Sequence, residues 1–334
     1  MASIRAAFAI RTGLGHRLAP ICLTACLVWA SALGAATAAE PGAREAFVTN
    51  QEGNSVSVVD LDTMAVAAEI PLGGNPAGIA MSGDRRFAYV AAPESKEVFV
   101  IDAEARTVAR RFPVGRGPLG IAAHPTKPTI YVADWYEHKL FVVDPESGKI
   151  TGGIETGQSP SGVAVTPDGA HVLTADRDSN QVSMIDTATL QRVAVIPTGD
   201  RPFGITIDAK GERAYTANVR SNDVTVIDLI ARKVVGTVPV GRRPYAVALA
   251  GGKAFVTDQY AETVTVFDTT TLKEAGKIAV GGYPEGISAS KDGRFVWVAC
   301  WEDNTLEQID VSTLTVVHRV TVGAGPRAFG EFLR

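Results

Sequence analysis

The sequence predicts an all-β fold, a seven-bladed β-propeller with four antiparallel strands in each blade. An aliphatic-aliphatic-Asp tripeptide, or a close variant of it, returns seven times, and a Gly-x-x-Pro motif keeps the same period. Of the six intervals between the aspartates, five are 42 residues and one is 40. Such a period is typical of propeller blades, because one blade cannot bury its apolar face alone. The aspartates are Asp60, Asp102, Asp144, Asp186, Asp228, Asp268 and Asp310, and the prolines are Pro76, Pro118, Pro160, Pro202, Pro244, Pro284 and Pro326.

The unit from Gly78 to Gly117 shows the expected strands of one blade in order. Short runs rich in Val, Ile, Phe and Tyr are separated by turns rich in Gly, Pro, Asp and Ser, and no window has the period of a helix. Strands A to D, lettered from the propeller axis outward, are expected at 78–81, 87–92, 98–102 and 107–114. Tight turns between them favour an antiparallel meander.

The two ends of the array predict how the ring closes. The first copy starts with a B strand at Ala46, and the last copy ends after an A strand, Arg327–Leu333. We therefore expect Arg327–Leu333 to complete the N-terminal blade, formed by Ala46–Leu72, and to close the ring. Residues 39–334 then form a single domain.

The meander also predicts two different rims. B-to-C and D-to-A loops share one rim, and A-to-B and C-to-D turns share the other. The seven aspartates are expected to cap the C-to-D turns by accepting backbone N–H bonds. In the Gly-x-x-Pro motif, we expect the glycine to supply an unusual dihedral angle and the proline to fix the entry into strand A. Function is then expected on the loops that vary between copies.

Three segments resemble the repeats of the YVTN family of propellers: FVTNQEGNSVSVVD (Phe47–Asp60), YTANVRSNDVTVID (Tyr215–Asp228) and VGRGPLGIA (Val114–Ala122). The resemblance covers residues 44–334. It implies an exported bacterial or archaeal seven-bladed propeller, with a looser similarity to the propeller subunits of periplasmic quinoprotein amine dehydrogenases. Those subunits are mainly scaffolds and docking surfaces, and their cofactor lies on another chain.

Residues 1–38 are interpreted as a secretory signal peptide. They contain Arg5, Arg11 and Arg17 but no acid, then the apolar stretch Leu18–Leu33 and a run of small residues. This favours a periplasmic or secreted protein without a membrane span in its mature chain. An alternative is a lipid anchor on Cys26, because Leu23–Cys26 resembles a lipobox; the apolar residues that follow Cys26 make it the second choice.

Loss of the signal peptide changes the formal net charge from −4 to −7. An acidic chain without a basic stripe argues against a nucleic-acid ligand. Cys300 would be the only cysteine of the mature chain, and at the end of a B strand it is interpreted as a packed small residue.

Candidate binding residues lie on the B-to-C loops. The third and seventh copies carry large aromatic residues where other copies have small polar ones, a composition suited to a recognition surface. Alternatively, these rings cover a loop of the neighbouring blade. The candidates are Trp135, Tyr136, His138, Arg177, Arg220, Tyr260, Trp301 and Glu302.

A second group of candidates follows the prolines of the Gly-x-x-Pro motif, at the mouth of the axial channel. It consists of Phe203, Tyr245, Glu285 and Arg327, which could bind a small polar or aromatic ligand. The favoured alternative is that Glu285 and Arg327 pair where the ring closes.

Other motifs have structural interpretations. Gly115–Gly120 matches a dinucleotide-binding pattern, but no helix follows it. Asp176, Asp178 and Asn180 match the start of a calcium loop, whose glycine and distal glutamate are missing. The remaining histidines, His124, His138, His171 and His318, lack metal-site spacing and are interpreted as surface residues. No catalytic residues, metal or cofactor are therefore expected.

The leading hypothesis is a periplasmic, non-catalytic propeller that binds an unknown partner protein or small ligand on the rim of B-to-C and D-to-A loops. One alternative is an accessory subunit or catalytic relative of a periplasmic quinoprotein dehydrogenase or of a propeller lyase. Another is a cell-envelope protein displayed at the surface.

Overall fold

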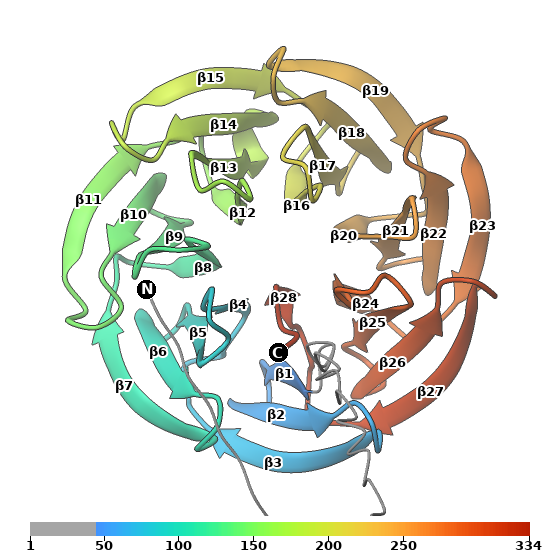
Figure 1. The fold of residues 1–334 in the computed structure, drawn as a ribbon, viewed down its shortest axis with the longest axis horizontal. Coiled ribbons are helices and arrows are strands. Elements are labelled where there is room, and N and C mark those ends of the chain that lie inside the picture. The colour runs from blue at the N-terminus through green and yellow to red at the C-terminus, as the bar shows by residue number, and fades with distance from the viewer. Residues whose placement is uncertain (1–44) are drawn as a thin grey trace, which may run out of the picture. The chain divides into compact units, whose positions relative to one another are not determined.

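The computed structural model describes residues 45–334, which form seven β-sheets around a central axis (Figure 1). The predicted seven-bladed propeller is confirmed. The signal peptide expected at 1–38 and the alternative lipid anchor at Cys26 lie outside the described residues. Within 45–334, no helix has the length and hydropathy that a membrane crossing would require.

Six blades follow the predicted A-to-D order, and the N-terminal sheet has only its B, C and D strands. The A strands are β4 (Gly78–Met81), β8 (Pro118–Ala123), β12 (Pro160–Val165), β16 (Pro202–Ile207), β20 (Pro244–Ala250) and β24 (Pro284–Ala289). The B strands are β1 (Glu45–Asn50), β5 (Phe87–Ala92), β9 (Ile130–Asp134), β13 (His171–Asp176), β17 (Arg213–Asn218), β21 (Lys253–Asp258) and β25 (Phe295–Cys300).

The outer two strands of each blade complete the sheets. The C strands are β2 (Ser55–Asp60), β6 (Glu97–Asp102), β10 (Lys139–Val143), β14 (Gln181–Asp186), β18 (Asp223–Asp228), β22 (Thr263–Asp268) and β26 (Thr305–Asp310). The D strands are β3 (Ala65–Pro71), β7 (Thr107–Pro113), β11 (Ile150–Glu155), β15 (Arg192–Pro197), β19 (Lys233–Pro239), β23 (Glu274–Ala279) and β27 (Thr315–Thr321). One 3-10 turn, η1 (Arg177–Ser179), follows β13.

Burial decreases from the middle of a blade to its outer edge. B strands such as β17 and C strands such as β18 are almost entirely buried, because neighbouring blades cover both of their faces. The D strands form the perimeter of the ring (Figure 1), and β19 exposes most of its residues. The apolar core therefore lies between blades, as expected for units that cannot fold alone.

The C-terminal strand β28 (Phe329–Gly330) closes the ring, as predicted, but it joins the blade β4–β7 and does not complete the N-terminal blade as a fourth strand. It pairs in parallel with β4 of the blade β4–β7, and two antiparallel bridges, Ala46 to Leu333 and Asn50 to Pro326, tie its segment to β1. The contact with the N-terminal blade is thus limited to bridges. The ladder with β1 is interrupted because Ala328 and Gly330 have φ angles of 43° and 129°, which are not extended conformations.

The C-to-D turns have the predicted capping. Asp186 Oδ1, for example, accepts hydrogen bonds from the backbone N–H groups of Ala188 and Thr189 at 3.0 and 2.7 Å. Equivalent backbone bonds reach the other six aspartates of the motif.

The role predicted for the glycine of the Gly-x-x-Pro motif is confirmed in two copies and is wrong for the other five. Only Gly73 and Gly115 among its seven copies have a positive φ. The others provide space instead: the N–H of Gly241 donates to Asp258 Oδ1 at 2.9 Å, and a Cβ atom on Gly241 would lie 2.4 Å from Asp258 Cγ. Close approach to the end of strand B therefore requires glycine.

Candidate functional site

The B-to-C and D-to-A loops share one rim, as predicted, and we call it the loop rim. Backbone hydrogen bonds join the two kinds of loop directly. Trp135 N donates to Gly117 O, and Trp301 N donates to Tyr283 O, both at 3.0 Å. Trp135 and Trp301 therefore lie on the same rim.

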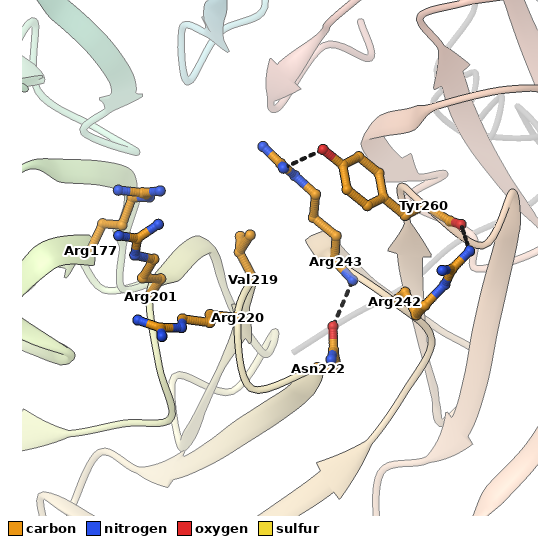
Figure 2. A pocket seen from close by; sticks show the side chains of 8 residues that line it. All are labelled: Arg177, Arg201, Val219, Arg220, Asn222, Arg242, Arg243 and Tyr260. Atoms are coloured by element: carbon orange, nitrogen blue, oxygen red, sulfur yellow. Dashed lines mark hydrogen bonds between the residues drawn. The ribbon is translucent and has the colours of Figure 1, made fainter.

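Five arginines gather on the loop rim around a cavity of 340 Å³, shown in Figure 2. They come from the loops that follow β13, β15, β17 and β19, so adjacent blades supply them. We call this cavity the arginine pocket. Its lining is Arg177, Arg201, Val219, Arg220, Asn222, Arg242, Arg243 and Tyr260.

Only part of the arginine pocket is predicted by the sequence. Arg177, Arg220 and Tyr260 were among the candidates, but Arg201, Arg242 and Arg243 were missed because the Gly-x-x-Pro motif was interpreted as purely structural. The available signal was the pair of variable positions inside that motif, which read Asp-Arg in one copy and Arg-Arg in the next.

Two asparagines fix the backbone of the missed arginines. Arg201 N donates to Asn180 Oδ1 and Arg243 N donates to Asn222 Oδ1, both at 2.8 Å. Arg201 and Arg243 have φ angles of 59° and 55°, in the left-handed region that non-glycine residues rarely adopt. The asparagines therefore hold both arginines in place from the preceding blade. Asn180 has the turn-forming role that the sequence favoured over calcium binding.

His138 occupies the same repeat position in the third copy. Its Nδ1 accepts a hydrogen bond of 3.0 Å from Ser159 N, and its own φ is 57°. This geometry matches that of the asparagines. His138, one of the candidate binding residues, therefore holds a turn in the same way as Asn180 and Asn222 do.

Positive charge exceeds negative charge in the arginine pocket. Among the described residues, Asp178 is the only acid paired with its arginines, 2.6 Å from Arg177 Nη1 and 3.9 Å from Arg201 Nε. No ion pair involves the other three arginines in the part of the chain described. Burial lowers the pKa of Arg177, the Asp178 carboxylate opposes this shift, and the charges of Arg201 and Arg243 add to it.

Tyr260 contacts the two arginines of the Arg-Arg pair. Arg243 Nη1 donates to the Tyr260 hydroxyl at 2.5 Å, and the Arg243 guanidinium carbon lies 4.6 Å from the centre of the ring. Arg242 Nη2 donates to the Tyr260 carbonyl oxygen at 2.8 Å. These contacts, drawn in Figure 2, fix one wall of the pocket.

A second cavity of 520 Å³ adjoins the arginine pocket and is more balanced in charge. Arg177, Arg201 and Arg220 line both cavities, and Asp178 and Asp200 line the second one. The excess of positive charge is therefore greatest in the first cavity.

Aromatic side chains flank the arginine pocket on both sides. The Trp135 ring lies 6.4 Å from that of Phe203 and is covered by Arg177 at 5.4 Å. On the other side, ring contacts connect Tyr260 to Tyr283 at 5.3 Å and Tyr283 to Trp301 at 6.0 Å. Both tryptophans thus pack on neighbouring loops, while Tyr136 is 63% exposed. Glu302 is also exposed.

The second group of candidates forms a buried cluster at the axis. Arg327 Nε lies 3.2 Å from Glu285 Oε2 and donates to the Tyr245 hydroxyl at 2.7 Å, while Gln259 Nε2 donates to Glu285 Oε1 at 2.5 Å. Burial raises the pKa of Glu285, and the charge of Arg327 opposes that shift. The favoured pairing of Glu285 with Arg327 is present. Phe203 and Tyr245 are at most 7% exposed, so ligand binding by this cluster stays a prediction.

A sequence model of the YNCE-like β-propeller family matches residues 25–129 and 144–253, more than half of the chain. The chain belongs to this family. No curated protein matches it significantly. Many solved structures are similar to this YNCE-like propeller in fold, and two of them are described next.

One is Kuenenia stuttgartiensis hydrazine synthase, with a TM-score of 0.72 and 21% identity over 83% of this chain and 99% of that one. The other is a functionally unknown protein from Desulfotomaculum acetoxidans, with a TM-score of 0.74 and 18% identity over 86% of this chain and 98% of that one.

Among residues 45–334, no group of three or more His, Cys, Asp or Glu side chains could hold a metal ion. Cys300 is fully buried, and burial raises the pKa of its thiol.

The interpretation of His124 as a surface residue is wrong. Its side chain is 3% exposed, and its Nδ1 accepts hydrogen bonds from the N–H groups of Thr126 and Lys127. The turn at Thr126 and Lys127 folds over the imidazole of His124, because Nδ1 accepts hydrogen bonds from both backbone N–H groups.

Proposed function

We propose that this YNCE-like propeller is an exported, non-catalytic binding protein whose loop rim engages a small ligand or partner protein. The observation that carries the proposal is the arginine pocket. Five arginines lie around one cavity, and a single acid is paired with them among the described residues. Like charges that the fold brings together repel each other. We therefore attribute the clustering of these arginines to the binding of a ligand or partner.

Two further observations support an exported binding role. The chain resembles the YVTN-repeat propellers in Phe47–Asp60 and Tyr215–Asp228, and its first 38 residues have the composition of a signal peptide. The exposed Tyr136 ring and the Trp301 loop extend the same rim, and aromatic residues beside charges are typical of recognition surfaces.

A second candidate function is a propeller subunit of a periplasmic enzyme complex. It is favoured by one comparison, since a chain of this fold occurs in the structure of hydrazine synthase. A stable complex with a second chain, or a chromophore in the protein purified from its own periplasm, would support this role. A colourless monomer in size-exclusion chromatography would count against it.

Photo-crosslinking from the two rims tests the binding surface. A photoreactive amino acid is placed at Tyr136 on the loop rim or, as a matched control, at Ile230, which is 79% exposed on a C-to-D turn of the opposite rim. We expect specific adducts from position 136 and none from position 230. Adducts that form only from position 230, or equally from both, would refute the assignment of the rim. Cell fractionation tests export in the same strains.

A further inference from the structure

The arginine pocket concentrates positive charge on an acidic protein. The chain has 36 acidic and 32 basic residues, yet five arginines line one cavity that no acidic side chain lines. Like charges that are held close together at a protein surface repel each other. An anion in the cavity would convert this repulsion into attraction.

The positions of the arginines are fixed by the fold rather than by their own flexibility. Asn180 and Asn222 hold the backbones of Arg201 and Arg243, and Asp178 and Tyr260 hold side chains on the two sides of the cavity. Figure 2 shows Arg177, Arg201 and Arg220 on one side and Arg243 with Tyr260 on the other. A ligand between them would be contacted from both sides.

Several guanidinium donors of the pocket have no partner within the described part of the chain. Each arginine has five N–H donors. Arg243 uses Nη1 on the Tyr260 hydroxyl, and no side-chain hydrogen bond of Arg220 occurs among residues 45–334. The planar fork of arginine matches the oxygens of a phosphate or carboxylate group in a bidentate manner.

The size of the cavity limits its ligand. A volume of 340 Å³ lies near the lower end of the range for small-molecule sites, about 300 to 1,000 Å³. Acids outnumber bases on the rest of the loop rim: Glu94, Glu137, Glu302 and Asp303 lie on other B-to-C loops, and the bases there include Lys96 and Arg116. A compact anion fits this distribution of charge better than a long polyanion that follows the rim.

We propose that the arginine pocket binds a small anion with at least two negative charges on oxygen, either a phosphate ester or a polycarboxylate. Arg201, Arg220 and Arg243 are its principal ligands, and Asn180 and Asn222 are positioning residues. This inference rests on the proposed function of the loop rim as a binding surface, and it specifies the chemistry of the ligand.

Calorimetric titration of the purified protein at low ionic strength tests the proposal. The probes are pyrophosphate, citrate, inorganic phosphate and, as a singly charged control, acetate. We expect one site for pyrophosphate or citrate, weaker binding of inorganic phosphate and none of acetate. Affinity should fall as salt is added, because screening weakens exposed charge interactions. Preference for pyrophosphate or for citrate distinguishes the phosphate from the carboxylate class.

Single substitutions locate the site. Arg201→Gln, Arg220→Gln and Arg243→Gln should each weaken binding by about tenfold or more, the loss expected for a charge-assisted hydrogen bond. The matched control is Arg116→Gln. Arg116 has the same repeat position as Arg242 and lies on the same rim, but it does not line the pocket. Its substitution should leave affinity unchanged. Because Arg220 is exposed, its variant should keep the wild-type melting temperature.

Three outcomes would overturn the inference: no binding of any small anion, an equal loss in Arg116→Gln, or binding of single-stranded DNA without binding of the small anions. Adducts from Tyr136 that persist in such a case would leave the proposed function of the rim intact.

Discussion

Asn222 Oδ1 accepts a hydrogen bond of 2.8 Å from the backbone N–H of Arg243. The same bond joins Asn54 to Asn75 at 3.0 Å, far along the rim from the arginine pocket. One turn contact thus recurs in the ring, and at Asn180 and Asn222 it also fixes the backbone of an arginine of the arginine pocket. Structural and binding roles of the contact can therefore be separated by comparing Asn222 with Asn54.

Asn222→Gly should weaken both stability and anion binding. Glycine tolerates the φ of 59° at this position but removes the acceptor, so we expect a loss of about 1 kcal/mol in the free energy of unfolding. Asn54→Gly is the matched control, with a similar loss of stability in urea denaturation and unchanged anion affinity. Equal effects of both variants on anion affinity would show that Asn222 does not position Arg243.

Removal of Glu285 should be strongly destabilising. Glu285→Ala leaves Arg327 buried without its acidic partner, and breaking a buried pair from one side costs about 3 to 5 kcal/mol. Adding Arg327→Met should restore part of the loss, because the uncompensated charge is then gone. Chemical denaturation of the single and double variants measures this. A loss below about 1 kcal/mol in Glu285→Ala would show that the pair does not stabilise the closed ring.

The glycines of the Gly-x-x-Pro motif should not tolerate alanine. Gly241→Ala places a Cβ atom 2.4 Å from Cγ of Asp258, which is fully buried and cannot move aside. Overpacking of this kind costs about 1 to 3 kcal/mol. In the control Gly153→Ala, the nearest atoms are 3.7 Å away, so the melting temperature should be unchanged or slightly higher. A tolerated Gly241→Ala would mean that the loop can shift away from strand B.

Asp258 should make the protein less stable as the pH rises towards neutrality. Burial raises the pKa of this carboxyl, although hydroxyl donors from Thr265 and Thr263 oppose the shift. A raised folded pKa means that its stabilising contribution is complete below pH of about 4 and is lost as the pH rises through the folded pKa. Asp258→Asn should therefore gain stability relative to wild type between about pH 4 and pH 7. Asn218 occupies the same repeat position, which shows that the fold accepts asparagine there. The melting temperatures of wild type and Asp258→Asn, measured across this pH range, test the prediction. A constant difference between the two proteins would contradict it.

The C-to-D turns should show the opposite dependence on pH. Backbone N–H bonds from Thr189 and Thr271 lower the pKa values of Asp186 and Asp268. Their contribution is present above pH of about 4 and is lost as the pH falls through the folded pKa values. The double variant Asp186→Asn with Asp268→Asn keeps the capping oxygens but does not titrate. Its melting temperature should fall less steeply than that of wild type below pH 4. An identical fall would show that these turns do not contribute to acid unfolding.

The repeat determined the fold because it is a local and periodic signal. Each copy carries its own strands, its Asp turn and its proline, so the number of blades could be counted from Asp60 to Asp310. The ring closure was harder to derive in detail. The positive φ angles of Ala328 and Gly330 interrupt the ladder with β1, and nothing in the sequence pattern of this last A strand indicates that interruption.

The candidate site was less predictable, because its residues come from loops that are distant in sequence. Arg201 and Arg243 are 42 residues apart, and each appeared to be a variable position in a structural motif. Only the ring geometry brings them to the same cavity as Arg177. Glu285 and Arg327 were easier to relate, since they follow the same proline in adjacent copies.

The meeting of Pro326–Leu333 with both β1 and β4 has a consequence for biogenesis. Hydrogen bonds such as Arg327 N to Thr49 O and Phe47 N to Phe332 O join the first and the last of the described strands. Without Pro326–Leu333 in place, the ring stays open between β1 and β4, and the edges of two sheets are exposed. The ring can therefore close only after Pro326–Leu333 has left the ribosome.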